Sequence, residues 1–506
     1  MKKNSTLIFK KVFSVTVIIL IAKLLGFIKQ MITAGIYGAT IETDLINLSQ
    51  NLIGNIEYVL RQVFITSFIP IYIQVKNSDE AYGNKYISKI FKLWTIISIC
   101  IMLLFALTAP VLSRIIAPTY SAELSYRLTK YIRYFCPALI MLVYATVFNS
   151  ILRANQHFNE GEFSSVIQSV VIIFMSLAIG KTKGPVVLAI GYYVYLIINF
   201  IYLSISSRPY WSADIKIDVA IDNEVKKQIK MAGPLFLGYA MVFINQEVDA
   251  IIVSGIGEGA VTALGYAAVL LNLVVTLIGS VSSVFFTYIS QYIAEEKEKQ
   301  VADLIIKANR ICTAVLIPIS IIFIVNAREI ITIIFARGAF SHQAVAFATN
   351  ALIGYAFSIP FLSSKELFSR FQYGYMDSKQ PMINTAISII SNIFLSIVLS
   401  HYIGIFGVTL ATSISTMISG ILNMLMSKRH NKYLVNILEF RDVFSAIISA
   451  CFCIFVSFWL REFIPSSYHF IRVLVTASIS LLINILMFWR YVVQGIHMLK
   501  MVKMKR

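Results

Sequence analysis

The chain has 506 residues, of which 58% are hydrophobic and only 13% are charged, and its mean hydropathy is +0.78. A soluble domain has about 25% charged residues, so this composition excludes a soluble enzyme and indicates an integral membrane protein. The formal net charge is +18, but the basic residues fall in alternate loops and at both ends of the chain. That placement indicates membrane topology and argues against nucleic acid as a partner.

About fourteen segments are apolar over some 20 residues, the length that crosses a bilayer. The predicted fold class is therefore an all-α integral membrane protein with about 14 transmembrane helices, arranged as two six-helix halves plus two C-terminal helices. The expected spans are 12–37, 45–73, 90–113, 129–152, 163–180, 185–206, 229–254, 261–291, 309–335, 346–373, 382–401, 404–427, 442–461 and 469–493.

The distribution of Lys and Arg predicts the orientation of these spans. With the N-terminus in the cytoplasm, the cytoplasmic segments hold about 27 basic residues and the opposite loops about 6, as the positive-inside rule requires. An even number of spans then places both termini in the cytoplasm.

Short sequence matches at an offset of roughly 220 residues indicate an internal repeat. AGIYGA (34–39) resembles SGIGEGA (254–260), and VIIFMS (171–176) resembles SNIFLS (391–396). Two parallel halves of this kind bind substrate between them. The predicted domains are an N-terminal half (1–206), a cytoplasmic linker (207–228), a C-terminal half (229–428), and two extra helices with a basic tail (429–506).

The second span carries a polar stripe. Asn47, Asn51 and Asn55 recur every four residues, and Glu57 and Arg61 follow one turn apart, which places them on one side of a helix. Such a stripe does not face lipid: it lines a water-filled cavity or packs against another polar helix. We expect Glu57 and Arg61 to neutralise each other.

Two further spans carry polar groups. Gln246 and Asp249 share a face of the seventh span; they counter basic groups, bind a coupling cation, or simply hydrogen-bond between helices. In the tenth span Glu366 and Arg370 have the spacing of a local ion pair, which leaves Lys365 as a cation without that partner.

Lys23, Lys29 and Asp44 lie in or beside the first two spans. Charges at such depth cost roughly 2.5–3.5 kcal/mol each, so they face a bundle interior or a wet cavity, unless they lie at helix ends and reach the interface. A cavity with these lysines suits an anionic head group. No phosphate-binding loop, catalytic triad or zinc motif is present, so we expect neither an enzyme nor a cofactor. An ion gradient, the membrane potential or the substrate gradient would supply the energy.

Four motifs resemble the MurJ (MviN) lipid II flippases, which belong to the multidrug/oligosaccharidyl-lipid/polysaccharide exporter superfamily. They are LLGFIKQMITAGIYGATIETD (24–44), FIPIY (68–72), FARGAF (335–340) and YGYMDSKQP (373–381). The resemblance implies alternating-access transfer of undecaprenyl-diphosphate-linked peptidoglycan precursor (lipid II) from the inner to the outer leaflet of the bacterial cytoplasmic membrane. It implies that Lys23, Lys29 and Asp44 occupy functional positions, and with Arg61 and Lys365 they form our predicted diphosphate site. The expected partners are the lipid-linked glycan, membrane lipids and cell-wall synthesis proteins.

The sequence also departs from this family. Lys23 and Lys29 stand where the family has arginines, and Val269 stands where it usually has an arginine in the eighth span. Lysine keeps the charge but loses the bidentate fork of arginine. Three alternatives therefore stay open: a flippase for an O-antigen or capsule repeat unit, a cation-coupled drug exporter, and a non-transporting scaffold.

Overall fold

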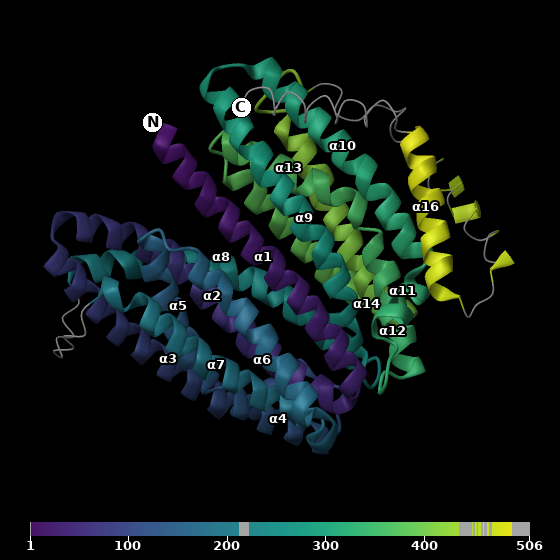
Figure 1. The fold of residues 1–506 in the computed structure, drawn as a ribbon, viewed down its shortest axis with the longest axis horizontal. Coiled ribbons are helices and arrows are strands. Elements are labelled where there is room, and N and C mark those ends of the chain that lie inside the picture. Colours follow the sequence, from purple (N-terminus) through teal and green to yellow (C-terminus); the bar gives the residue numbers. More distant parts are fainter. Residues whose placement is uncertain are drawn as a thin grey trace. The chain divides into compact units, whose positions relative to one another are not determined.

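The computed structural model describes residues 2–211, 222–434 and 468–487, with scattered residues between 448 and 464. In this part of the chain every regular element is a helix and no strand is present (Figure 1). The chain forms two compact units. Unit 1 comprises Met1–Thr262 and Arg337–Phe340, and unit 2 comprises Ala263–Ala336 and Ser341–Arg506.

Unit 1 is built on α2, which packs against α3, α4, α5, α7 and α8, while α1 packs along α6. Thr40 caps α2: its hydroxyl accepts from the Thr43 N–H, and the Thr43 hydroxyl accepts in return from the Thr40 N–H. The helices of this unit are α1 (Lys2–Tyr37), α2 (Ile41–Ser78), α3 (Glu80–Ile116), α4 (Ala122–Phe135), α5 (Ala138–Ala154), α6 (Asn159–Lys183), α7 (Val186–Ser207), the short 3-10 helix η1 (Arg208–Tyr210) and α8 (Asn223–Ser254).

An aromatic core joins α2 to its neighbours in unit 1. The ring of Phe68 stacks on Phe64, Tyr72 and Tyr86 at centroid distances of 4.8, 5.3 and 5.8 Å. The Tyr86 hydroxyl on α3 donates to Oε1 of Gln228 on α8 over 2.8 Å. The same core includes Val143, Val147 and Ile151 of α5, so it packs the C-terminal half of α2 against α3 and α5.

Unit 2 is built around α10 and the pair α13–α14, and α16 packs on α10 and α11 (Figure 1). Its buried core includes Ile305, Phe368 and Phe371. The helices are α9 (Ala260–Ala294), which begins in unit 1, α10 (Glu298–Val325), α11 (Ala327–Phe335), α12 (His342–Ala356), α13 (Ile359–Gly374), α14 (Lys379–Ser427) and α16 (His469–Met487).

The structure confirms the all-α membrane class, but not the count of fourteen spans. Within the described residues, nine helices are long and apolar enough to cross a membrane, or ten if α12 and α13, which are bent by 48° at their junction, form one span. The helix breaks within the expected spans 129–152 and 309–335, between α4 and α5 and between α10 and α11, although Ala122–Ala154 counts as one of the nine candidate crossings. The break expected after residue 401 is present, because Ile403 and Gly404 leave the helical conformation inside α14. The expected span 442–461 lies largely outside the described residues.

The backbone repeats at the same offset as the sequence. Residues with positive φ recur about 220 positions apart as Gly38 and Gly259, as Gln156 and Met376, and as Gly184 and Gly404. Two serine caps follow the same rule: the Ser121 hydroxyl accepts from the Leu124 N–H, and the Ser341 hydroxyl accepts from the Ala344 N–H. Turns and caps therefore recur in order along both halves of the sequence.

The compact units and the predicted halves differ at α8. The sequence analysis assigned residues 229–254 to the C-terminal half, but α8 packs on α2 and α3 and belongs to unit 1. The expected linker 207–228 lies partly outside the described residues, which omit 212–221.

Candidate functional site

Unit 1 contains a polar cavity of about 340 Å³ between α2, α5, α6 and α7. Carboxamide, hydroxyl and ion-paired side chains form most of its wall. The lining residues are Gln50, Asn51, Gly54, Asn55, Glu57, Arg61, Leu142, Ala145, Thr146, Asn149, Gly161, Ser164, Ser165, Gln168, Tyr192, Tyr195, Asn199 and Leu203. Asn149 and Gly161 flank the α5–α6 turn, so the cavity lies toward the end of unit 1 that carries this turn.

The polar stripe of α2 lines this cavity as the sequence predicted for four of its five residues: Asn51, Asn55, Glu57 and Arg61. Nε of Arg61 lies 3.1 Å from Oε1 of Glu57, so the two charges neutralise each other. The Thr146 hydroxyl on α5 donates to the same Glu57 oxygen over 3.2 Å. The carboxylate is therefore held between α2 and α5, and the cavity gains no net charge from the pair.

Asn55 has a second role at the edge of the cavity. Its Nδ2 donates to Oε1 of the buried Glu247 on α8 over 2.6 Å. A buried carboxylate needs such a donor, since leaving it unpaired is costly. Asn55 therefore connects the cavity wall to α8.

The sequence analysis missed the contribution of α7. Tyr192, Tyr195 and Asn199 all line the cavity, and each is more than nine-tenths buried. Their spacing of three and four places them on one face of an otherwise apolar helix. That polar stripe is the sequence signal that would have revealed them.

Two buried polar atoms on residues that line the cavity have no hydrogen-bond partner among the described residues. They are Oδ1 of Asn199 and Oγ of Ser164. The residue Asn199 is 2% exposed. A buried polar group without a partner costs about 1–3 kcal/mol.

Asp44 lies at the other end of α2, about 20 Å from Glu57 at 1.5 Å per residue. It is fully buried. Its carboxylate accepts from the Gly259 N–H (2.8 Å), the Thr262 N–H (2.8 Å) and the Thr262 hydroxyl (2.6 Å). An acid at a helix N-terminus satisfies unpaired N–H groups and complements the helix dipole. The structure thus places Asp44 in the cap of α9, and its part in a diphosphate site stays a prediction.

Asn47 also belongs to this end of α2. Its Nδ2 donates to the Thr262 hydroxyl over 2.9 Å. Asn47 is absent from the lining of the cavity, so this member of the predicted polar stripe joins helices.

Three turns meet at the Asp44 end of unit 1. Gly38, Gly259 and Gly338 all have positive φ, a conformation that glycine adopts without strain. A Cβ atom on Gly38 would overlap the Ala339 carbonyl, and one on Gly259 would overlap the Ala39 carbonyl. The Ala339 N–H donates to the Gly35 carbonyl over 3.0 Å. The FARGAF segment is therefore docked by backbone contacts on the turn between α1 and α2.

The predicted cationic residues lie apart from the cavity lining. Lys23 is exposed on the surface of unit 1 and Lys29 is half-buried, both on α1, and Lys365 is half-buried on α13 of unit 2. The side chain of none of the three forms a hydrogen bond or ion pair with a described residue. Their part in a diphosphate site stays a prediction. The ion pair expected between Glu366 and Arg370 is not formed, and Nε of Arg370 is buried without a partner in the described part of the chain.

The polar residues predicted on the seventh span lie on α8. Asp249 is half-buried there and does not line the cavity. The side chain of Gln246 lies outside the described residues. Their predicted roles stay untested.

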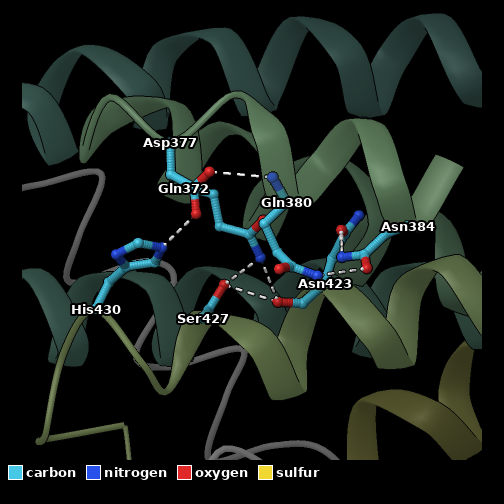
Figure 2. Close-up of polar contacts among 7 residues, drawn as sticks. All are labelled: Gln372, Asp377, Gln380, Asn384, Asn423, Ser427 and His430. Carbon is cyan, nitrogen blue, oxygen red and sulfur yellow. Dashed lines mark hydrogen bonds and ion pairs between the residues drawn. The ribbon is translucent and has the colours of Figure 1, made fainter.

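Unit 2 holds a chain of amides between α13 and α14 (Figure 2). Gln380 Nε2 donates to Asn384 Oδ1 (3.0 Å), and Asn384 Nδ2 donates to Asn423 Oδ1 (2.7 Å). Gln372 Nε2 donates to the Asn423 carbonyl and to Ser427 Oγ. At the end of this chain, Nε2 of His430 lies 2.9 Å from Oδ2 of Asp377.

Residues 33–501 match the model of a protein family described as lipid II flippase MurJ. The probable lipid II flippase MurJ of Rickettsia prowazekii is 23% identical over 485 residues, which cover 93% of this chain and 94% of that protein. The probable lipid II flippase MurJ of Treponema pallidum is 21% identical over 496 residues, covering 93% and 92%.

Solved structures share the fold. A lipid II flippase MurJ in an inward closed conformation matches with a TM-score of 0.81 at 21% identity, covering 94% of this chain and 99% of that one. An inward-facing MATE family transporter of the MOP superfamily matches with a TM-score of 0.68 at 15% identity, covering 82% and 95%.

Proposed function

The chain belongs to the lipid II flippase MurJ family, and on that premise we propose that it moves lipid II from the inner to the outer leaflet of the bacterial cytoplasmic membrane by alternating access. The observation that carries this proposal is the family match, which extends over residues 33–501. It is a transport function, and we assign no chemical step to any residue.

The geometry of unit 1 supports transport by alternating access. One end is closed by the Asp44 cap and by the docked FARGAF segment. The polar cavity lies toward the opposite end, which carries the α5–α6 turn. With the N-terminus in the cytoplasm, that turn is cytoplasmic, so a head group would enter the cavity from the inner leaflet. Release on the other side requires the Asp44 cap and the FARGAF contacts to open.

We assign the diphosphate to cations that have no acidic partner. Lys23 and Lys29 of unit 1 meet this condition among the described residues, and Lys365 meets it within unit 2, whereas Arg61 is neutralised by Glu57. A free lysine binds phosphate as a point charge. The lipid tail stays in the bilayer, where its transfer to water would be unfavourable. The membrane potential or a coupling cation would drive the cycle.

A flippase for another lipid-linked surface polysaccharide is the second candidate. Val269 on α9 favours it, because the family that the motifs resemble usually has an arginine there. Both candidates keep a diphosphate-linked glycan as substrate and membrane lipids as surroundings. They differ in the sugars of the head group, and cell-wall synthesis proteins are partners only of the first.

Rescue of bacterial growth separates the two candidates. Expression of the chain in a strain depleted of its own lipid II flippase should restore growth. Lys23→Ala with Lys29→Ala should abolish rescue at unchanged membrane abundance, while arginine at both positions should retain it. Failure of the abundant wild-type protein to rescue, combined with rescue of a strain lacking its O-antigen flippase, would replace the first function by the second.

A further inference from the structure

A second recess of unit 1 lies between α4 and α7. Its volume is about 570 Å³, within the roughly 300–1,000 Å³ typical of ligand pockets. The lining residues are Arg127, Lys130, Tyr131 and Tyr134 of α4, and Val186, Ala189 and Ile190 of α7. None of them lines the polar cavity described above, so this recess is a separate site.

The two walls of the recess differ in chemistry. The wall from α4 carries two cations and two phenols, the wall from α7 is aliphatic, and no acid lines either one. Exposed apolar side chains continue from the recess along one face of α7, at Val186, Ile190, Ile197 and Ile201. A small free anion would leave this apolar face uncovered. A ligand with an anionic head and a long apolar chain matches both walls.

Lys130 is the cation that the recess offers to a ligand. The guanidinium of Arg127 is paired with Glu42 of α2, and the Tyr131 hydroxyl donates to the same carboxylate over 3.2 Å. Arg127 therefore adds little net charge. The exposed ammonium of Lys130 lies 4.4 Å from the centroid of the Tyr126 ring and forms no hydrogen bond or ion pair with a described residue.

Tyr134 places a hydroxyl donor beside this charge. It follows Lys130 by four residues, so both side chains lie on one side of α4. The Tyr134 ring packs edge-to-face on Tyr193 of α7 at 5.0 Å, and the Tyr193 hydroxyl donates to the Tyr134 carbonyl. This contact joins α4 and α7 beside the recess. The Tyr134 hydroxyl itself forms no hydrogen bond with a described residue, so it is available to a phosphate oxygen.

The recess lies at the level of lipid head groups. Val186 is the first residue of α7, so Lys130, which lines the same recess, is level with the point where this apolar span begins. Helical side chains point toward the helix N-terminus, which carries the Lys130 ammonium toward the start of α4. Tyrosines and basic residues are typical of this interfacial depth. With the N-terminus in the cytoplasm, this end of unit 1 faces the outer leaflet.

We propose that the recess between α4 and α7 binds an anionic phospholipid of the outer leaflet. Lys130 and Tyr134 hold its phosphate, and one acyl chain follows the exposed face of α7. The single available cation balances the one negative charge of a phosphodiester, whereas a diphosphate carries more charge than Lys130 can balance. The inference goes beyond the proposed function, because the ligand is a resident lipid of the bilayer and not the transported one.

Native mass spectrometry of the purified full chain with added phosphatidylglycerol tests this site, with phosphatidylethanolamine of the same acyl chains as the comparison lipid. The wild type should bind phosphatidylglycerol more tightly. Lys130→Gln should weaken this binding about fivefold, the effect of one basic residue near an anionic lipid, and leave phosphatidylethanolamine unchanged. Lys85→Gln is the matched control, since it removes one exposed charge of α3 outside the recess, and it should bind as the wild type.

Two further variants test the other parts of the site. Tyr134→Phe removes the hydroxyl and should weaken the binding of phosphatidylglycerol in the same direction as Lys130→Gln. Ile190→Trp fills the recess at an exposed position and should weaken the binding of both lipids.

Equal losses in Lys130→Gln and Lys85→Gln, or equal binding of the two lipids by the wild type, would overturn the site. Displacement of phosphatidylglycerol by a lower concentration of undecaprenyl diphosphate would assign the recess to a lipid-linked diphosphate instead. A dimer that Ile190→Trp dissociates would assign it to a second copy of the chain. These results are independent of lipid II transfer, so failure of the lipid site leaves the proposed function standing.

Discussion

The α5–α7 region of unit 1 and the α13–α14 region of unit 2, about 220 positions apart in the sequence, differ in how their carboxamides are bonded. In unit 1 polar residues of α5, α6 and α7 line a cavity, and the carboxamide of Asn199 forms no hydrogen bond with a described residue. In unit 2 the corresponding α13 and α14 are joined by direct bonds between amides, with Asn384 and Asn423 bonded at both ends of their carboxamides (Figure 2). Oε1 of Gln372 in that chain of amides is buried without a partner among the described residues, as are Oδ1 of Asn392 and Oγ of Ser419 elsewhere on α14.

The difference shows what a bonded amide contributes. Buried amides that bond one another hold two helices together, since each loses little by leaving water. A buried amide without a partner leaves its hydrogen-bonding capacity unused at a cost in stability. We infer that the amide chain of unit 2 holds α13 and α14 together, whereas Asn199 of unit 1 forms no such link.

The largest loss of stability is expected at glycines that hold the same backbone conformation in both halves of the sequence. Gly38 and Gly259 are repeat partners, and each holds positive φ against a facing carbonyl. Gly38→Ala or Gly259→Ala should each lower the free energy of unfolding by about 2–4 kcal/mol, because left-handed strain adds to the steric overlap. Thermal unfolding of the detergent-solubilised protein measures this. Gly265→Ala is the control, since a Cβ there meets no atom within 4 Å; equal losses in all three variants would contradict the account.

The next largest loss of stability is expected in the amide chain of unit 2, and not in the cavity of unit 1. Asn423→Leu should lower the free energy of unfolding by about 1–3 kcal/mol, because it leaves the Asn384 amide buried without its acceptor. Asn199→Leu should leave stability unchanged or raise it. Fluorescence-detected size-exclusion chromatography after heating compares the two variants. A loss in Asn199→Leu as large as in Asn423→Leu would break the distinction between an amide that links two helices and one that does not.

A third prediction tests whether the ion pair between Glu57 and Arg61 leaves the cavity without net charge. Glu57→Gln frees the positive charge of Arg61, so inorganic diphosphate should bind this variant at least about tenfold more tightly than the wild type, a gain of about 1.4 kcal/mol. The double variant Glu57→Gln, Arg61→Gln is the control and should lose that gain. Isothermal titration calorimetry measures both affinities. Equal binding of diphosphate by the wild type and Glu57→Gln would show that the ion pair does not neutralise Arg61.

The smallest effect is a pH dependence confined to unit 2. The Gln380 N–H, and to a lesser degree His430, hold the pKa of Asp377 below its usual value. A depressed folded pKa gives stability that is present above the unfolded pKa, near 3.9, and is lost as the pH falls through the folded value. Stability should therefore fall slightly below about pH 4. Asp377→Asn should flatten this dependence in a thermal unfolding series, and an unchanged series would exclude the contribution of Asp377.

Much of this arrangement follows from residue spacing. The i, i+4 recurrence on α2 predicted cavity lining for Asn51, Asn55, Glu57 and Arg61, and Gly404 coincides with the predicted break in α14. Local periodicity determines such features, so the sequence reveals them. The role of Asp44 depends on Thr262, which is more than 200 positions away, and no local pattern encodes that pairing. The cavity face of α7 was missed because its polar stripe was read as part of an apolar span.

Transfer of lipid II between leaflets in reconstituted vesicles tests the central claim most directly. Lipid II with a labelled head group is placed in one leaflet, and its arrival in the other is followed with a membrane-impermeant reagent. The account predicts rapid transfer by the wild type, background transfer by the variant with Lys23→Ala and Lys29→Ala, and retained transfer with arginine at both positions. Wild-type protein that fails to move lipid II, or alanine variants that move it as fast as the wild type, would contradict it.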